Sequence, residues 1–303
     1  MGVVQWSVRV KREKGEEKRR ALLESGFLDR SLRIRVEGDQ VILPVTAPLE
    51  DAGRDEFEPL GEITGLPRHE LIGGIAIMPE RDGEGAMRLL SSRPSLHTVL
   101  HPLGPVDGEY RTKRFEVLAG IPTARTLYTE YGRRYQIDLE HAYFSARLAE
   151  ERQRLSKLVE RGEKVLDMFS GVGPVAITLS ERAGIVFASD INPVAVHLLI
   201  LNIKLNRVKN VVPIMANASH LHLLLPQKFD RIVMNLPMST PAFIDTARAI
   251  CAGGGVIHFY VLQSETHEFS PFLEGRGLLV LDERKVHTYS PGRWLAVYDL
   301  SCP

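Results

Sequence analysis

Residues 165–173, with the sequence VLDMFSGVG, have the pattern of a ligand-binding loop between a strand and a helix. Apolar residues lead to Asp167, the chain then passes through Phe169, Gly171 and Gly173, and a helical pattern follows. A parallel strand passes to a helix in this way in nucleotide-binding α/β domains. Glycine has no Cβ, so we expect the backbone at Gly171 and Gly173 to bend tightly and to let a ligand lie directly against it.

The same loop lacks features that other cofactors need. It has no GxxxxGK[ST] lysine to hold a triphosphate, and it does not read as the GxGxxG of a dinucleotide site. An acid just upstream of a glycine loop without a lysine favours a cofactor that carries no phosphate, such as S-adenosylmethionine.

Polar residues are expected at four strand ends, which is where open parallel sheets bind their ligands. These residues are Asp167 with Ser170, then Asp190, Asn217 and Asn235. Asp190 follows Asp167 at close to the roughly 20-residue spacing at which an acid binds ribose hydroxyls. A carboxylate suits that task because it accepts two hydrogen bonds from the diol. One such Asp alone would more often be a helix N-cap, but the four ends together indicate a cofactor site.

Three regions must position these residues, and we expect domains at 1–62, 68–160 and 161–303. In the first, a strand over 3–12, a charged helical run over 13–25 and a strand pair turning at Glu37-Gly38-Asp39 predict a small α/β unit. The acid-, Gly- and Pro-rich stretch 51–67 is typical of a linker. The second region predicts strands at 71–78, 95–103 and 115–120, a hairpin turning at Tyr131-Gly132, and a helix over 146–161.

Strands and helices alternate in the third region, which predicts a parallel, doubly wound sheet. Strands are expected at 164–169, 184–190, 211–217, 229–237 and 256–261, and helices at 174–183, 193–205 and 242–252, the last closed by Gly253–Gly255. An antiparallel pair around Ser290-Pro291-Gly292 closes the sheet. The expected fold class is α/β, a Rossmann-like doubly wound sheet with an antiparallel closing strand, similar to that of class I methyltransferases, plus two smaller N-terminal α+β domains.

Composition sets limits on the kind of protein. The 303 residues are 44% apolar and 25% charged, no apolar run reaches about 18 residues, and no signal peptide is visible. Cys251 and Cys302 have no zinc spacing, so we expect a cytoplasmic protein without disulfides or a metal. The formal net charge of zero argues weakly against a nucleic-acid partner. Basic residues nevertheless cluster at 11–20, 111–114 and 133–134, either as solvated faces or as RNA backbone contacts.

Together these segments resemble the Trm-five family, the tRNA (guanine-37, N1) methyltransferases, in its archaeal and eukaryotic form. The resemblance spans roughly residues 70 to 303, and the N-terminal unit is similar to the small tRNA-elbow domain of some archaeal members. The stretches that carry it are GEYRTKRFEVLAG (108–120), YFSARLAEER (143–152), VLDMFSGVGP (165–174), FDRIVMNLP (229–237), GGVIHFY (254–260) and YSPGRWLAVYDL (289–300).

The resemblance implies roles for matching residues. Glu151 would be the general base that takes the N1 proton of guanine, and Arg111 would stabilise charge on O6. Asn235 and Pro237 would hold the base and the cofactor. The remaining cofactor contacts would come from Tyr143, Arg147 and Arg152 at the methionine end, Asp190 with Ile191 at the ribose, Asn217 with Ala218 at the adenine, and Asp167, Phe169, Gly171 and Gly173 in the glycine loop.

Two positions depart from the family pattern. Gly74 stands where an acid is common, and Asn217 stands at a strand end that often carries an acid.

Arg147 and Glu151, four residues apart, would share a helix face as an ordinary ion pair. The resemblance implies S-adenosylmethionine as the cofactor and tRNA, at position 37 and at its elbow, as the partner. We also expect no membrane association, because no apolar run is long enough, and a monomer.

Other functions remain open. A related transferase moves the aminocarboxypropyl group of the same cofactor, and some relatives methylate a wyosine intermediate. The Asn235-Leu236-Pro237 tripeptide favours methyl transfer. A non-catalytic RNA-binding protein with this fold, or a methyltransferase for another RNA or a small molecule, are the remaining alternatives.

Overall fold

A four-stranded antiparallel sheet organises the first of the two units that make up the chain, residues 1–66. The computed structural model describes residues 2–29, 31–59 and 65–303. Leu22 of the helix packs against Val8, Leu43 and Val45 of the sheet. The elements of this unit are β1 (Val3–Lys11), η1 (Arg12–Lys14), α1 (Gly15–Glu24), β2 (Arg35–Glu37), β3 (Gln40–Val45) and β4 (Gly53–Phe57), with the sheet order β2-β3-β1-β4.

The prediction of a linker over 51–67 was wrong for its first half. Residues Gly53–Phe57 form β4, which pairs antiparallel with β1. Phe57 is fully buried and clusters with Leu32 and Ile42. Asp55 of the same strand accepts hydrogen bonds from Ser7 at 2.6 Å and from Arg9 at 3.1 Å on β1. With a single large apolar residue, such an edge strand has a weak sequence pattern. Residues 60–64 lie outside the described part of the chain.

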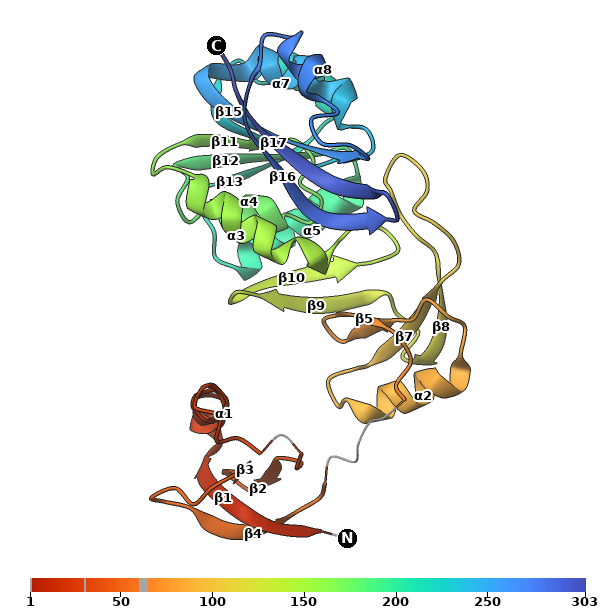
Figure 1. The fold of residues 1–303 in the computed structure, drawn as a ribbon, viewed down its shortest axis with the longest axis vertical. Helices are drawn as coiled ribbons and strands as arrows, with labels where there is room; N and C mark the ends of the chain where they lie inside the picture. The colour runs from red at the N-terminus through yellow and green to blue at the C-terminus, as the bar shows by residue number, and fades with distance from the viewer. Residues whose placement is uncertain (1, 30, 60–64) are drawn as a thin grey trace. The chain divides into compact units, whose positions relative to one another are not determined.

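The second unit, residues 67–303, begins with two small sheets (Figure 1). The helix α2 (Gly83–Ser92), which the sequence analysis did not identify, is capped by Asp82, whose side chain accepts a hydrogen bond from the Gly85 amide at 2.8 Å. The strands are β5 (Glu70–Ile72), β6 (Ile75–Ile77), β7 (Thr98–Pro102) and β8 (Phe115–Gly120) in one sheet, and the hairpin β9 (Arg125–Glu130) and β10 (Arg133–Asp138) in the other.

Residues 71–78 are not one strand, as expected, but the hairpin β5–β6. Its turn is Gly73-Gly74, where Gly73 has a φ of +57°. A Cβ on Gly74 would lie 2.4 Å from the ring of His97, so an acid at this position would displace that ring. The hairpin β9–β10 was predicted correctly, with Tyr131 and Gly132 both at positive φ.

A seven-stranded sheet forms the rest of the second unit and confirms the predicted class I methyltransferase fold. Its order is β13-β12-β11-β14-β15-β17-β16, with the first five strands parallel and β17 antiparallel to both neighbours. The strands are β11 (Lys164–Asp167), β12 (Ile185–Asp190), β13 (Val211–Met215), β14 (Phe229–Met234), β15 (Cys251–Gln263), β16 (Leu279–Ser290) and β17 (Arg293–Ser301).

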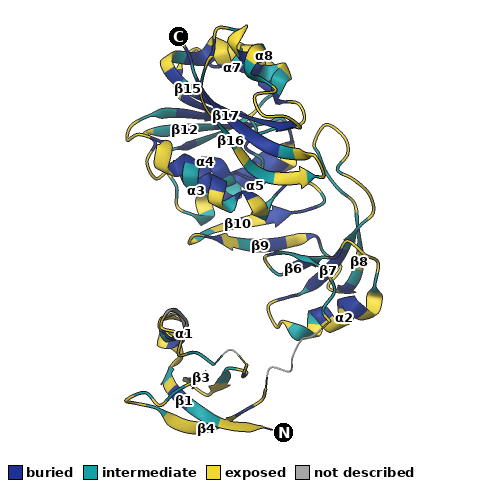
Figure 2. Cartoon of the chain, in the orientation of Figure 1, coloured by how far each residue is buried: buried dark blue, intermediate teal, exposed yellow. Residues whose placement is uncertain are grey.

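Helices cover both faces of this sheet (Figure 1). One apolar cluster joins the first set of helices to Val165, Val233 and Tyr260, and a second joins the other set to Leu166, Ile232 and Phe259. Buried residues therefore line the strands from both sides (Figure 2). The first set is η2 (Ala146–Leu148), α3 (Ala149–Leu158), α4 (Pro174–Leu179) and α5 (Pro193–Leu205), and the second is η3 (Ala218–His220), α6 (Leu221–Leu224), η4 (Thr240–Phe243), α7 (Ile244–Ile250) and α8 (Ser270–Glu274).

Three expectations about helix ends need correction. The helix expected over 174–183, α4, ends at Leu179. The helix expected over 146–161 is a 3-10 turn followed by α3, so Arg147 and Glu151 do not share an α-helical face. The helix expected over 242–252 ends at Ile250, and the glycines 253–255 lie within β15, where its register with β14 is irregular.

The predicted domain division near residue 160 stays a prediction. An apolar cluster joins Ile72 and Tyr135 to Ala195 across it.

Asn202 on α5 ties the hairpin β9–β10 to the glycine loop. Its side-chain oxygen accepts a hydrogen bond from the Gln136 amide at 2.7 Å, and its amide nitrogen donates to the carbonyls of Gln136 at 3.1 Å and Val172 at 2.9 Å. The residue is fully buried, so no water competes for these bonds. Helix α5 thus fixes two walls of the site described below.

Replacing Asn202 with Ala should lower the free energy of unfolding by about 2–3 kcal/mol, because buried backbone groups lose their partners. Asn206→Ala is the matched control. Asn206 lies one turn later, makes the same pair of bonds to the backbone of Arg134, and is partly exposed, so water can replace it. Denaturant unfolding measures both, and equal losses would contradict the assigned role of Asn202.

Candidate cofactor and catalytic site

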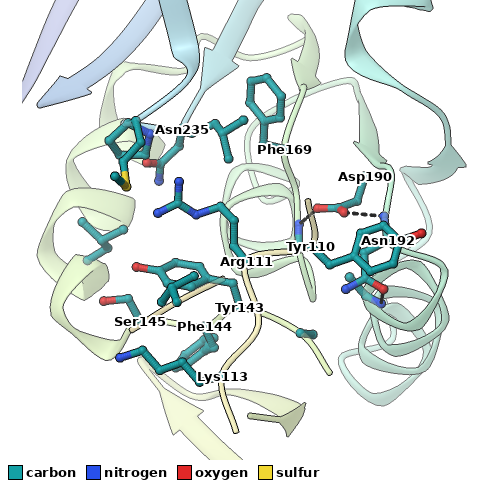
Figure 3. Close-up of a pocket in the computed structure, with 18 of the residues that line it drawn as sticks. Tyr110, Arg111, Lys113, Tyr143, Phe144, Ser145, Phe169, Asp190, Asn192 and Asn235 are labelled. Atoms are coloured by element: carbon teal, nitrogen blue, oxygen red, sulfur yellow. Dashed lines mark hydrogen bonds between the residues drawn. The ribbon is translucent and has the colours of Figure 1, made fainter. Parts of the chain in front are cut away.

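A cavity of about 400 Å³ lies at the carboxyl ends of the parallel strands, within the second unit (Figure 3). The sheet order reverses between β11 and β14, and such a switch point is where open α/β sheets bind ligands. One set of walls follows the four strand ends, with residues 168–169 and 171, 190–192, 216–218 and 235–238. The other walls come from residues 109–111, 113, 142–145, 147, 287 and 289.

Most of the residues expected in the site line this cavity, and four do not. Those that do are Arg111, Tyr143, Arg147, Phe169, Gly171, Asp190, Ile191, Asn217, Ala218, Asn235 and Pro237. Glu151, Arg152, Asp167 and Gly173 are not among the lining residues.

Asp190 at the end of β12 fastens the glycine loop. One of its carboxylate oxygens accepts a hydrogen bond from the Gly171 amide at 2.7 Å, and the other accepts one from the Asn192 amide at 2.9 Å (Figure 3). Gly171 has a φ of +53°, which glycine adopts without strain. Burial raises the pKa of Asp190, and the amides of Asn192, Gly171 and Ile191 oppose that rise. Each oxygen keeps a lone pair, so the carboxylate can still accept hydrogen bonds from a diol.

Asn217 follows β13 and caps the short helix η3. Its side-chain oxygen accepts a hydrogen bond from the Ser219 amide at 2.9 Å, so this oxygen is partly used. The side-chain NH₂ group is the donor that remains for a ligand. Ala218 is buried and contributes an apolar wall beside it, and Phe169 packs edge-on against Phe243 nearby, with ring centroids 5.1 Å apart.

Arg111 lies on a wall that is not part of the large sheet. Its guanidinium carbon stands 5.7 Å from the ring centroid of Tyr143, and the side chain extends toward Asn235 (Figure 3). Arg111 has a φ of +54°, which is costly for a residue with a Cβ, and it lies in a turn where its amide donates to the Gly108 carbonyl at 3.1 Å. Asn235 and Pro237 face the cavity from the end of β14, and the Pro237 carbonyl accepts a hydrogen bond from the Leu262 amide at 3.2 Å.

The expected ion pair between Arg147 and Glu151 does not form. Arg147 pairs with Glu70 of β5, with a nitrogen–oxygen distance of 2.9 Å. It lines the cavity, and this pair ties the start of α3 to the small sheet. The i, i+4 spacing failed because the helical turn at residues 146–148 is of the 3-10 type.

Glu151 is buried just under the cavity floor. One carboxylate oxygen accepts hydrogen bonds from the Tyr260 hydroxyl at 2.5 Å and from Arg154 Nε at 3.0 Å, and the other accepts one from Arg284. Its exposed fraction is 5%. Three donors, two of them guanidinium groups, therefore hold the carboxyl group, and it does not line the cavity.

Arg152 acts on the site through its neighbours. It forms a buried ion pair with Glu130, with nitrogen–oxygen distances of 2.8 and 2.5 Å, and it donates to the carbonyl of Ser145 at 3.2 Å. Its guanidinium carbon also lies 5.8 Å from the ring centroid of Phe144. Because Phe144 and Ser145 line the cavity, Arg152 supports that wall from behind.

Packing against α5 explains why residue 173 is a glycine, a position where we expected contact with the cofactor. Gly173 has a φ of +92°, and a Cβ there would lie 2.4 Å from a methyl carbon of Leu199 on α5. The residue is glycine because α4 and α5 pack closely at this point, and it does not line the cavity.

Comparison with known proteins places this geometry in a family. The TRM5/TYW2 methyltransferase domain matches residues 126–274, and the tRNA methyltransferase 5 N-terminal domain matches residues 7–53. The tRNA (guanine(37)-N(1))-methyltransferase Trm5b of Pyrococcus abyssi is 34% identical over 97% of this chain and 98% of its own length. The chain belongs to the TRM5/TYW2 family.

Two further relatives show how far the likeness extends. The solved complex of aTrm5 with tRNALeu has a TM-score of 0.72 and 28% identity, covering 99% of this chain and 100% of that one. A tRNA(Phe) (4-demethylwyosine(37)-C(7)) aminocarboxypropyltransferase of Methanocaldococcus jannaschii is 30% identical over 77% of this chain and 96% of its own length. The family uses S-adenosylmethionine.

Several residues that line the cavity of this chain were not assigned a role from the sequence. They are Tyr110, Lys113, Ser145, Asn192, Phe243, His287 and Tyr289. Tyr110 and Lys113 flank Arg111, and Tyr289 opens one of the stretches that carry the resemblance, so these could have been singled out. His287 lies on β16, and the buried Nδ1 of its ring has no hydrogen-bond partner among the described residues.

No helix in the described ranges has the length and apolar character needed to cross a membrane. Within those ranges, no group of three or more His, Cys, Asp or Glu side chains could hold a metal ion. Cys251 and Cys302 are both buried and unpaired by a disulfide.

Asp167 at the end of β11 should make the stability depend on pH. It is 1% exposed, and neither carboxylate oxygen accepts a hydrogen bond of good geometry from a described residue. Burial raises the pKa of Asp167 to about 7 and the charge of Asp190 adds to the rise, while the nearby amides of Phe169 and Ala176, although poorly aligned, oppose it more weakly than burial. A raised carboxyl pKa stabilises the fold at low pH, and this contribution is lost as the pH rises from about 4 to 7, up to about 4 kcal/mol.

We therefore expect Asp167→Asn to remove the part of the stability decline between pH 4 and pH 7 that this carboxyl causes. Thermal unfolding of both proteins without cofactor, over that pH range, measures the difference. An unchanged pH profile in the variant would show that Asp167 is ionised at little cost. Asp245→Asn, an exposed Asp on α7, is the control and should keep the wild-type profile.

Proposed function

We propose that the protein transfers a methyl group from S-adenosylmethionine to N1 of guanosine 37 in tRNA. The observation that carries the proposal is a single cavity with two unlike walls. The strand ends bring Asp190, Asn217 and the glycine loop together, and the facing wall presents Arg111, Tyr143 and Asn235. The near full-length match to a relative named for this reaction supports it.

The strand-end wall fits the cofactor. Bound S-adenosylmethionine supplies an electrophilic methyl group on a sulfonium sulfur. Asp190 would accept hydrogen bonds from the ribose hydroxyls, and the Asn217 NH₂ group would donate to the adenine ring. Gly171 leaves room for a ligand at the backbone, because a Cβ there would have only the Tyr143 carbonyl, at 3.5 Å, within 4 Å among the described residues.

The facing wall fits a guanine that must lose a proton. The N1 of guanine carries a proton and its lone pair is delocalised, so it is a weak nucleophile. Removal of the proton places negative charge on O6, and a cation beside O6 stabilises the transition state. We assign the stabilising cation to Arg111 and the positioning of the base to Asn235 and Pro237.

Glu151 is our candidate for the general base. Its carboxylate lies under the cavity floor and is held by Arg284 on one oxygen. Catalytic hydrogen bonds are often completed only when substrate is bound, so this geometry does not exclude the role. In our proposal the carboxylate exchanges Arg284 for the N1 proton when guanine enters.

The first unit would bind tRNA away from the reaction centre, at the elbow, while the second binds the anticodon stem-loop, and the protein would act as a monomer. Lys11, Arg12 and Lys14 are exposed and form no ion pair with another described residue. Such cations are suited to phosphate contacts. Lys113 and Arg111 at the cavity add positive charge where the nucleotide would enter.

Aminocarboxypropyl transfer is the second candidate, because a relative with that name covers 77% of the chain. Methyl transfer is favoured by the Asn235-Leu236-Pro237 turn at the cavity, and by the match of the N-terminal unit to the tRNA methyltransferase 5 N-terminal domain. Mass spectrometry of tRNA nucleosides after reaction distinguishes methylguanosine, an aminocarboxypropyl product, a methylated wyosine intermediate and no product.

Glu151→Gln should lower kcat by about 10²- to 10⁴-fold, the usual contribution of a general base. The affinities for cofactor and tRNA should stay near those of the wild type, because Gln keeps the size of the side chain. Single-turnover transfer of labelled methyl to tRNA measures the rate. Glu150→Gln changes the adjacent, exposed Glu and should be fully active. Wild-type rates in Glu151→Gln would remove this residue from the role of base.

Removing residues 1–66 should weaken tRNA binding and leave the affinity for S-adenosylmethionine unchanged, because the cavity belongs wholly to the second unit.

In the full-length protein, changing Lys11, Arg12 and Lys14 together to Gln should reduce the slope of log affinity against log salt by about 2–3. Titrations of tRNA at several salt concentrations test both. An unchanged tRNA affinity after truncation would contradict the role of the first unit.

A further inference from the structure

A buried chain of charged and polar side chains lies beneath the cavity and ends at Glu151. It crosses three strands on the sheet face that α3 covers. Its members are, in order, Glu163 before β11, Arg231 on β14, His258 on β15, Asp299 on β17 and Arg154 on α3.

The direction of each hydrogen bond in this chain is fixed by its arginines. Arg231 donates from Nε and Nη2 to the two oxygens of Glu163 at 2.7 and 2.8 Å, and from Nη1 to His258 Nε2 at 2.8 Å. A guanidinium only donates, so His258 Nε2 must accept and the ring carries its proton on Nδ1. That proton is donated to Asp299 Oδ1 at 2.6 Å.

Arg154 connects Asp299 to the candidate base. Its Nη1 donates to Asp299 Oδ2 at 2.8 Å, and its Nε donates to Glu151 Oε1 at 3.0 Å. One guanidinium thus bridges two carboxylates. Because the position of Asp299 is fixed by His258, the position of Arg154, and with it that of Glu151 Oε1, is fixed as well.

The chain lies deep in the protein. His258 is fully buried, and Arg231 and Asp299 are 6% and 9% exposed. Burial lowers the pKa of His258, which agrees with its neutral state. Burial by itself raises the pKa of Asp299, but the hydrogen bonds from His258 and Arg154 outweigh it and hold that pKa below its usual range. Packed apolar side chains would often stabilise such a site as well, so stability alone is a weak reason for this arrangement.

The strand register places the chain in relation to the cavity. His258 pairs with Asp299, Tyr260 with Val297, and Leu262 with Leu295, in successive rows on one sheet face. Leu262 and Leu295 line the cavity. Glu151 binds Tyr260 in the row just below that floor, and the chain anchors it from the row below Tyr260.

The two oxygens of Glu151 are held differently. Oε1 accepts hydrogen bonds from Tyr260, which is fully buried, and from Arg154, whose side chain is 22% exposed. Oε2 has Arg284, which is 38% exposed. Release of Arg284 would free Oε2 for the substrate while Oε1 stays fixed.

We infer that Asp299, His258 and Arg231 are positioning residues that orient Glu151 through Arg154, an inference that rests on the proposed role of Glu151 as the base. None of these four residues lines the cavity. They would act on the rate of proton removal and not on the binding of either substrate.

The test is a double-mutant cycle in the full-length enzyme. Asp299→Asn keeps the shape of the side chain and removes the charge that holds Arg154. It should lower kcat by about 10- to 100-fold, the cost expected for a misplaced catalytic group. The KM values for tRNA and S-adenosylmethionine should change by no more than about twofold, because ground-state binding is untouched. In the Glu151→Gln background, Asp299→Asn should cause no further loss of kcat.

Asp245→Asn, the same substitution on an exposed residue of α7, controls for a general effect of charge and should leave kcat unchanged. A wild-type kcat in Asp299→Asn overturns the inference. An equal loss of kcat in the wild-type and Glu151→Gln backgrounds also overturns it, because the effect would then be structural. If Asp299→Asn does not fold, Arg154→Lys, which keeps the charge and removes the bridge, is judged by the same criteria.

The outcome separates this inference from the proposed function. If Glu151→Gln alone keeps the wild-type rate, the assignment of the base fails. If Glu151→Gln is inactive and Asp299→Asn is as active as wild type, only the positioning role fails.

Discussion

The pair of hydrogen bonds from the Gly171 and Asn192 amides to Asp190 is the interaction on which the site depends. It joins the loop after β11 to the end of β12, so the two neighbouring strand ends form one surface. Asn192 also caps α5, accepting a hydrogen bond from the Val194 amide at 2.9 Å, and Asn202 on the same helix holds the loop carbonyl of Val172. A carboxylate that satisfies two amides therefore holds the two strand ends together and still keeps lone pairs that face the cavity.

Charge is distributed unequally across the large sheet. The face under α6 and α7 is an apolar cluster, whereas the face under α3 carries Arg231, His258 and Asp299 among its apolar residues. Buried ions cost desolvation energy unless their partners are well placed. Here each donor has an acceptor at hydrogen-bonding distance, which offsets that cost, and the ions end at a carboxylate directly below the cavity. The buried, hydrogen-bonded charges of the sheet thus lie on one face, next to Glu151, our candidate for the general base.

The sequence predicted well what local patterns determine. The four strand ends, the helix over residues 193–205 and the hairpin turn at Tyr131-Gly132 all depend on neighbouring residues, and the structure confirms them. Partners far apart in the chain were not predictable. Arg147 binds Glu70, which lies 77 residues away, and Glu151 binds Arg284, 133 residues away. The edge strand β4 was missed because Phe57 is its one large apolar residue and the partners of Asp55, Ser7 and Arg9, lie 46 or more residues away. The close approach of Gly173 to Leu199 was not predictable for the same reason, because it depends on how α5 packs.

The two walls of the cavity have different origins. The strand ends belong to the large sheet, whereas Arg111 and Tyr143 come from segments that precede it in the chain. The strand ends contribute a carboxylate, Asp190, and the exposed backbone of Gly171, and the facing wall adds the cation of Arg111, 5.7 Å from the ring centroid of Tyr143. Polar groups of opposite charge therefore face one space from two separate parts of the second unit. A ligand that fills this space must contact both walls, so the packing between the small sheets and the large one decides how the two ends of the ligand are held.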